Sequence, residues 1–161
     1  MPSITSYLIT EHAVFSALFD QIERLLPDAQ SAGEVNRLAR LVEGVLTRHR
    51  DIEADLAYAS LDQQLAERGE LDQLHRDHEE IDAHLRQARV SPDRVEATRL
   101  LKLALKNSRN HFRREEQSVF PLFEKVFQPG SLEALGNTTI QSYQVSTRGR
   151  VKGVQGVAQV V

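Results

Sequence analysis

The chain has 161 residues, of which 40% are hydrophobic and 27% are charged, and its formal net charge is −3. This length and mixture are typical of one globular domain that buries a core, and the slightly acidic balance gives no general attraction to nucleic acid or to an anionic membrane. Cysteine is absent. This excludes disulfides and thiol catalysis, so any metal must be held by nitrogen and oxygen ligands.

The start of the chain shows no targeting signal. Residues 1–7 lack the basic region and apolar run of a signal peptide. An uninterrupted apolar stretch of about 18 residues, which a membrane-spanning helix needs, is also missing. We therefore expect a cytoplasmic protein with no membrane association.

The first half of the chain predicts two helices. Apolar residues recur at three- and four-residue steps over residues 4–26, and Pro27 ends this first helix. Ser31 and Glu34 form a capping box for a second helix. The apolar stripe of the second helix can continue to about residue 68.

The second half predicts two more helices. The third carries an apolar stripe over residues 71–85. Ser91 and Pro92 supply a cap and a first-turn proline for the fourth, and Pro121 should bend or end it near Phe120. Because short connections favour antiparallel neighbours, we expect an all-α protein built as an up-down-up-down four-helix bundle.

The C-terminal residues have a different composition. After Glu133 no acidic residue occurs, and glycines interrupt a sequence rich in Val, Thr and Gln. We expect a domain over residues 1–136 and a short non-helical, Gly- and Val-rich tail over residues 137–161. This tail either packs loosely, since such a segment buries little surface, or adds an extended strand to a partner chain and so supports a homo-oligomer.

Each predicted helix places one histidine on its apolar face, and the second and fourth helices add a glutamate four residues later. One histidine on such a face is more often a hydrogen-bonded core residue than a ligand. Four histidines and two carboxylates facing one axis favour a metal, which would satisfy all these buried polar groups together. The six residues are His12, His49, His78, His111, Glu53 and Glu115.

Two further histidines lie on the predicted third helix. His75 is three residues before His78, at the edge of the apolar stripe, and is a candidate for an additional metal ligand. His84 is six residues after His78, which rotates it off the stripe, so we expect it at the surface.

Sequence similarity between the two halves of the chain supports a paired site. Residues 49–58 resemble residues 111–120, and Glu11-His12 resembles Asp77-His78. Two helix pairs that each give a lone histidine and then a His/Glu pair would form a pseudo-symmetric site. Such symmetry suits two metal ions that are bridged by two carboxylates.

Together these motifs resemble the hemerythrin family, specifically the bacterial hemerythrin-like HHE cation-binding domains, over about residues 4–135. The resemblance implies a four-helix bundle with a non-haem di-iron centre, two iron ions with a bridging oxo or hydroxo group, for which Mn or Zn are possible substitutes. It implies two bridging carboxylates, Glu53 and Glu115, and four terminal ligands, His12, His49, His78 and His111.

The status of His75 changes the number of open coordination positions. In the oxygen-carrying members of the family the third helix gives two histidines four residues apart, whereas His75 and His78 are three apart. Two six-coordinate irons have about twelve positions, of which two bridging carboxylates and a bridging oxygen fill about six. Five histidines then leave one position open, which suits one diatomic ligand. Four histidines leave two open, which suits solvent, peroxide or NO.

Three functions remain open. The first is a di-iron protein that binds or senses dioxygen or NO. The second is a peroxide-decomposing, iron-oxidising or iron-supplying stress protein with the same centre, so the sequence leaves open whether the chain is an enzyme. The third is a helical interaction protein without metal. The ferritin-type Glu-x-x-His motif does not occur.

Overall fold

The computed structural model describes residues 2–54, 61 and 69–154. Within these residues all regular structure is helical and no strand occurs, which confirms the all-α prediction. None of these helices combines the length and the apolar character that crossing a lipid bilayer demands. The elements are α1 (Ile4–Leu25), η1 (Leu26–Asp28), α2 (Ala32–Ile52), α4 (Glu70–Ala88), α5 (Arg94–Arg114), η3 (Glu115–Val119), α6 (Phe120–Val126) and α7 (Pro129–Val154).

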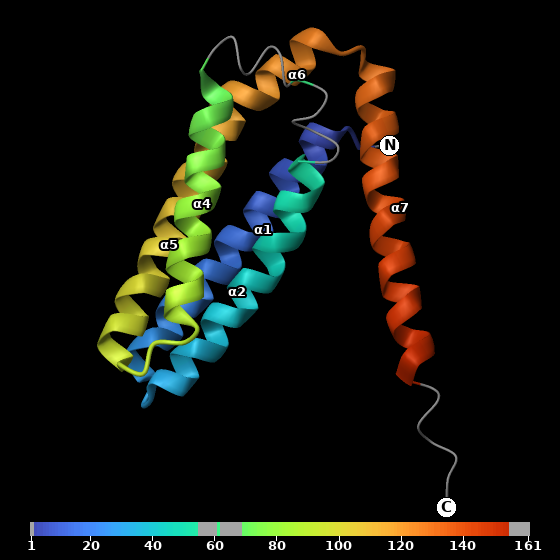
Figure 1. Cartoon of the computed structure of the whole chain (residues 1–161). Helices are drawn as coiled ribbons and strands as arrows, with labels where there is room; N and C mark the ends of the chain where they lie inside the picture. Colours follow the sequence, from blue (N-terminus) through green and yellow to red (C-terminus); the bar gives the residue numbers. More distant parts are fainter. Residues whose placement is uncertain (1, 55–60, 62–68, 155–161) are drawn as a thin grey trace, which may run out of the picture.

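Helices α1, α2, α4 and α5 correspond to the four predicted helices and lie alongside one another (Figure 1). Helix α4 packs against both α2 and α5, and α5 also contacts α1 and α2. The predicted continuation of the second helix to residue 68 falls outside the described residues, apart from the buried, helical Leu61.

Local capping explains where the helices begin. The hydroxyl of Ser31 accepts a hydrogen bond from the backbone N–H of Glu34, which confirms the predicted cap of α2. At α5 the cap is Asp93 rather than Ser91, since the Asp93 carboxylate accepts from the N–H of Glu96 at 2.8 Å. The fourth predicted helix reaches Arg114 and continues through the π-helical turn η3 into α6.

The apolar core consists of two clusters with a polar layer between them. One cluster includes Phe15, Leu46, Ile81 and Phe112. The other lies toward the opposite end of the same helices and includes Leu8, Ile52, Leu74 and Val119. His12, His49 and His78 fall between these two sets of positions along the chain, and His111 lies directly before Phe112. The helix register therefore brings all four to one level.

Helix α7 corrects the prediction of a non-helical tail. The chain is helical from Pro129 to Val154, so the domain boundary expected at residue 136 falls inside a helix. The glycines and β-branched residues of this segment disfavour a helix in isolation, whereas in the folded chain α7 packs against α1. The side chains of Leu132 and Thr139 are buried. Figure 1 shows α7 beginning beside the N-terminal end of α1.

Gly136 allows α7 to approach α1 closely. A Cβ atom at this position would overlap the carbonyl oxygen of Pro2 and lie 3.0 Å from the carbonyl carbon of Ser3. We expect Gly136→Ala to lower the free energy of unfolding by about 1–3 kcal/mol, because the backbones must separate. Gly44→Ala is the control: nothing lies within 4 Å of its added Cβ, so a gain of about 0.5–1 kcal/mol is expected. Urea denaturation measures both, and equal effects would contradict the close approach.

Candidate metal centre

Six polar side chains converge in the layer between the two apolar clusters. Three of the histidines are only 2% exposed, and both glutamates are fully buried. The fourth histidine, His78, has a side chain that is 15% exposed. Two groups can be distinguished in which one ligand atom per residue lies within 4.8 Å of every other. Position A is His12, His49, Glu53 and Glu115, and position B is Glu53, His78 and His111.

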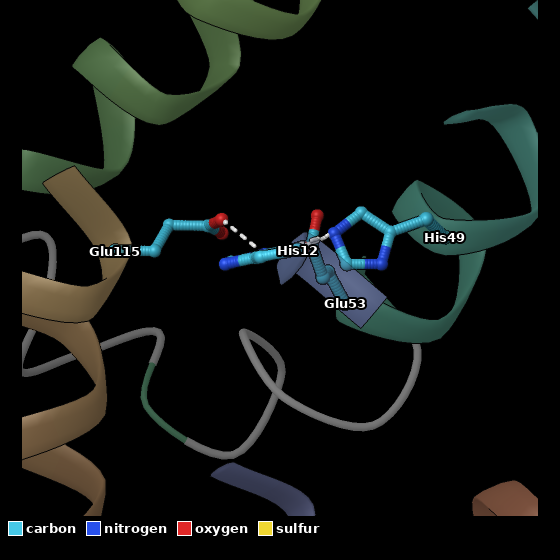
Figure 2. Close-up of side chains that lie close together, drawn as sticks. All are labelled: His12, His49, Glu53 and Glu115. Carbon is cyan, nitrogen blue, oxygen red and sulfur yellow. Dashed lines mark hydrogen bonds and ion pairs between the residues drawn. The ribbon is translucent and has the colours of Figure 1, made fainter. Parts of the chain in front are cut away.

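At position A two imidazoles face each other. Nε2 of His12 lies 3.1 Å from Nε2 of His49, which is close to the separation of two nitrogens that each bind one ion at about 2.1 Å and at a right angle. Oε1 of Glu53 is 2.7 Å from Nε2 of His49. Oε2 of Glu115 is 3.4 Å from Nε2 of His12. Figure 2 shows Glu115 and His49 approaching His12 from opposite sides.

The glutamates link the two positions. One oxygen of Glu53, Oε1, faces His49 at position A, and the other, Oε2, lies 3.4 Å from Nε2 of His78 at position B. Oε2 of Glu115 is 3.4 Å from Nε2 of His111 as well as from His12. Each carboxylate therefore stands between a histidine of one helix pair and a histidine of the other, as a bridging ligand would.

Both glutamates lie at the start of π-helical turns. Glu53 and Ala54 follow α2 in π-helical conformation, and Glu115 opens the π-helical turn η3. Such turns are rare and often occur at functional sites. Within the described residues, this similarity agrees with the sequence resemblance between the segments that begin at His49 and His111.

Acidic residues in an outer layer hold the imidazoles in place. Nδ1 of His49 donates to Glu11 at 2.8 Å, and Nδ1 of His12 donates to Glu116 at 2.9 Å. Asp77 lies 3.5 Å from Nδ1 of His111. A hydrogen bond at Nδ1 fixes the tautomer and leaves Nε2 for a metal. Sequence reasoning did not assign this role, although the Glu-His and Asp-His pairs that it singled out contain two of the three residues.

Aromatic rings form the wall of position A. The ring of Phe112 stacks on His12 with centroids 4.1 Å apart. Phe15 meets the ring of His49 at 5.2 Å, edge to face. These rings restrict rotation of the imidazoles and keep water away from them, which strengthens electrostatic interactions inside the site.

The structure does not bring His75 and His84 into this layer. His75 is exposed on α4 and belongs to neither position. The physical reason is its register: around α4, His75 lies on the side of His78 opposite to the buried Leu74 and Ile81, beyond the edge of the apolar stripe. His84 is partly buried rather than at the surface, and it also lies outside both positions.

A small cavity adjoins position B. Its volume is about 20 Å³, enough for one water-sized molecule. At its edge Arg50 of α2 forms an ion pair with Asp82 of α4. The other lining residues are Leu46, His49, His78, Ile81, Ser108, His111 and Phe112.

The buried charges perturb the acid–base equilibria of the metal-free site. Burial lowers the pKa of His49, but the negative charge of Glu53 and the hydrogen bonds to Glu11 and Glu53 together outweigh burial and raise the pKa to about 10. In the same way, Glu115 and the other neighbouring carboxylates together outweigh burial and raise the pKa of His111 to about 10 and that of His12 to about 9. Burial raises the pKa of Glu53, but the neighbouring histidines lower it well below its usual value. The carboxylates thus favour the protonated form of these imidazoles in the metal-free site.

The residues fit a pair of cations. Among the described residues, both oxygens of Glu53 and Nε2 of His111 are buried without a partner in hydrogen-bonding geometry. Orphaned buried groups of this kind are costly, and a cation at each position would satisfy them. Imidazole nitrogen and carboxylate oxygen suit iron, manganese or zinc.

Metal-free protein should lose stability as the pH rises. The folded-state pKa values of these three histidines exceed the unfolded value of about 6.5, so their stabilisation is complete below about pH 6.5 and is lost as the pH approaches 10. Between pH 6.5 and 9 we expect the Tm of chelator-treated protein to fall by about 5 °C or more. His75→Ala should leave this dependence unchanged.

The metal-loaded protein should show the opposite trend. Ligation needs neutral imidazoles, so the stabilisation that saturating Zn²⁺ confers should grow over the same pH range. Thermal melts with and without Zn²⁺ measure both trends. A Tm of the metal-free protein that rises with pH would show that the histidines are not paired with the glutamates.

Comparison with known proteins identifies the family. The family model described as hemerythrin HHE cation binding domain matches residues 3–130. No curated protein and no solved structure matches the chain. The match spans all four helices that carry the six converging side chains and confirms the resemblance found in the sequence. The chain is therefore a member of the hemerythrin HHE cation-binding domain family.

Proposed function

We propose that this protein binds two iron ions at positions A and B and uses them to bind or sense a small diatomic ligand, dioxygen or NO. The observation that carries the proposal is the convergence of four imidazoles and two fully buried carboxylates in one layer. The proposal takes α1, α2, α4 and α5 as an antiparallel up-down-up-down bundle within a domain of residues 1–136, with residues 137–161 as a C-terminal extension.

The chain's own residues have distinct tasks in this proposal. Four histidines, His12, His49, His78 and His111, would hold the ions through Nε2, and Glu53 and Glu115 would be shared between the two ions. Bound iron would supply open coordination positions and one-electron chemistry. The outer carboxylates orient the imidazoles, and the apolar clusters on both sides exclude bulk water.

The cavity beside position B is small. With about 20 Å³ it accepts one water-sized molecule, so a diatomic gas is a better match than an organic substrate. The ion pair of Arg50 and Asp82 lies at its edge. This size favours a gas or peroxide over larger ligands.

The exposure of His75 gives the second candidate function specific support. Without this side chain the set has four histidines, the count that leaves two coordination positions open and suits peroxide or NO chemistry. The alternative is therefore a peroxide-decomposing or iron-handling stress protein that uses the same centre.

Metal content tests the ligand set with a matched pair of variants on one helix. We expect about two metal ions per chain in the unaltered protein. His78→Ala should lose at least one of them, because it removes a donor of position B. His75→Ala should lose none, since His75 is exposed and belongs to neither position. Elemental analysis after dialysis measures this, and equal loss from both variants would refute the proposed register of α4.

Ligand exchange separates the two functions. Protein loaded with Fe²⁺ without oxygen should change its near-ultraviolet and visible absorption when dioxygen or NO is added, and the change should reverse under argon. Mixing with peroxide should produce no sustained oxygen evolution. Sustained evolution, together with an irreversible spectral change, would support the stress protein instead.

A further inference from the structure

A second stripe of side chains runs along the outer side of α2. Its five residues follow one another at steps of four, three, four and three, which is the spacing of a coiled-coil seam. They are Glu34, Leu38, Leu41, Val45 and Arg48. The inward stripe, which carries the metal ligands of α2, is separate from this outer stripe. Leu41 at the centre of the outer stripe is 49% exposed, so the repeat extends beyond what the core uses.

Helix α1 adds apolar side chains to the same side of the molecule. Val14, Leu18 and Leu25 are four and seven residues apart and so share one side of α1. Leu18 packs at the edge of the same core cluster as Leu38 and Val45, which places the two sets next to each other. Val14 is 60% exposed and Leu25 is 54% exposed. We call these three residues and the outer stripe the α1–α2 face; an exposed apolar surface of this kind marks an interaction site.

The α1–α2 face has a hollow on one side of Leu41 and a projecting side chain on the other. The hollow has a volume of about 300 Å³ and is lined by Leu25, Asp28, Ala29, Glu34, Arg37 and Leu38. Helices α1 and α2 lie side by side (Figure 1) and run in opposite directions, because residues 12 and 49 are in contact at one end and residues 25 and 38 share the hollow at the other. The exposed Val14 therefore lies about level with Arg48, away from the hollow.

Opposite charges lie at equal distances from the centre of the outer stripe. Glu34 is seven residues before Leu41, and Arg48 is seven residues after it. A two-fold axis at Leu41 would place Glu34 of each copy opposite Arg48 of the other, and Val14 of each copy over the hollow of the other. A face that is complementary to itself in this way is what a two-fold symmetric dimer requires. A parallel pairing would instead bring like charges together, which is costly.

We propose that the α1–α2 face is the interface through which two copies of this chain form a two-fold symmetric dimer. In this dimer the two α2 helices pair in an antiparallel manner, with Leu41 at the axis and Glu34 of each copy beside Arg48 of the other. The apolar side chains supply the binding energy, and the charges at the two ends set the register. The inference goes beyond the proposed function and does not depend on bound metal.

Sedimentation of the full-length protein tests the dimer. At about 50 μM, within the range in which standard interfaces associate, we expect twice the chain mass of 18.2 kDa. Leu41→Asp places two carboxylates at the axis, so it should weaken association by about tenfold or more. Val95→Asp is the matched control. Val95 is 71% exposed on α5, outside the α1–α2 face, so this variant should remain a dimer.

An exchange of charges tests the antiparallel pairing. Glu34→Arg leaves only arginines at both ends of the stripe, and Arg48→Glu leaves only glutamates. Each variant alone should associate about tenfold more weakly or worse, because like charges meet twice. An equimolar mixture of the two should regain the dimer, because every pair is then Arg with Glu. Circular dichroism of each variant checks that it remains folded.

The outcomes separate this inference from the proposed function. A monomer at all concentrations would overturn the dimer, and a dimer that Leu41→Asp leaves intact would show that another face makes the contact. A mixture of the charge variants that stays monomeric would refute the two-fold pairing. None of the substituted residues belongs to position A or B. Their metal content should therefore equal that of the unaltered protein, and loss of the dimer would leave the two-metal function standing.

Discussion

The structure depends on how six polar side chains are satisfied in a largely buried layer. Two fully buried glutamates and the histidines around them lie between two apolar clusters. Without a cation, the buried carboxylates favour protonated histidines. With a cation at each position, the same groups would become ligands. Leaving these buried polar groups unsatisfied is costly. The register of all four helices is therefore constrained, because a shift of one residue in any helix would turn one of these side chains away from the layer.

Several local features follow from that requirement. The helices loosen into π-helical turns where Glu53 and Glu115 must reach the centre. Acidic residues from neighbouring helices fix the imidazoles from behind, and Phe112 closes the layer on the side of His12. The outer contacts differ between the two sides of the layer, since Arg114 donates to Asp77 beside His111 and Tyr7 donates to Glu11 beside His49.

The periodicity of the sequence predicted the features that depend on a single helix. The positions of His12, His49, His78 and His111 relative to the apolar stripe, and of the two glutamates one turn later, are properties of single amphipathic helices. Contacts between helices could not be predicted in this way. The partnership of Glu11 with His49 crosses from α1 to α2. Helix α7 owes its stability to packing on α1 and so contradicts the weak helix propensity of its own residues.

His75 shows the limit of spacing arguments most clearly, because only the angle around α4 decides whether a residue at the edge of the stripe faces the layer.

The central claim, a pair of ions shared by two carboxylates, has one direct test. Crystals of the iron-loaded protein, measured at the iron absorption edge, should show two anomalous peaks about 3.5–4 Å apart between Glu53 and Glu115. A layer without anomalous density, in an ordered crystal whose protein contains iron, would contradict the account.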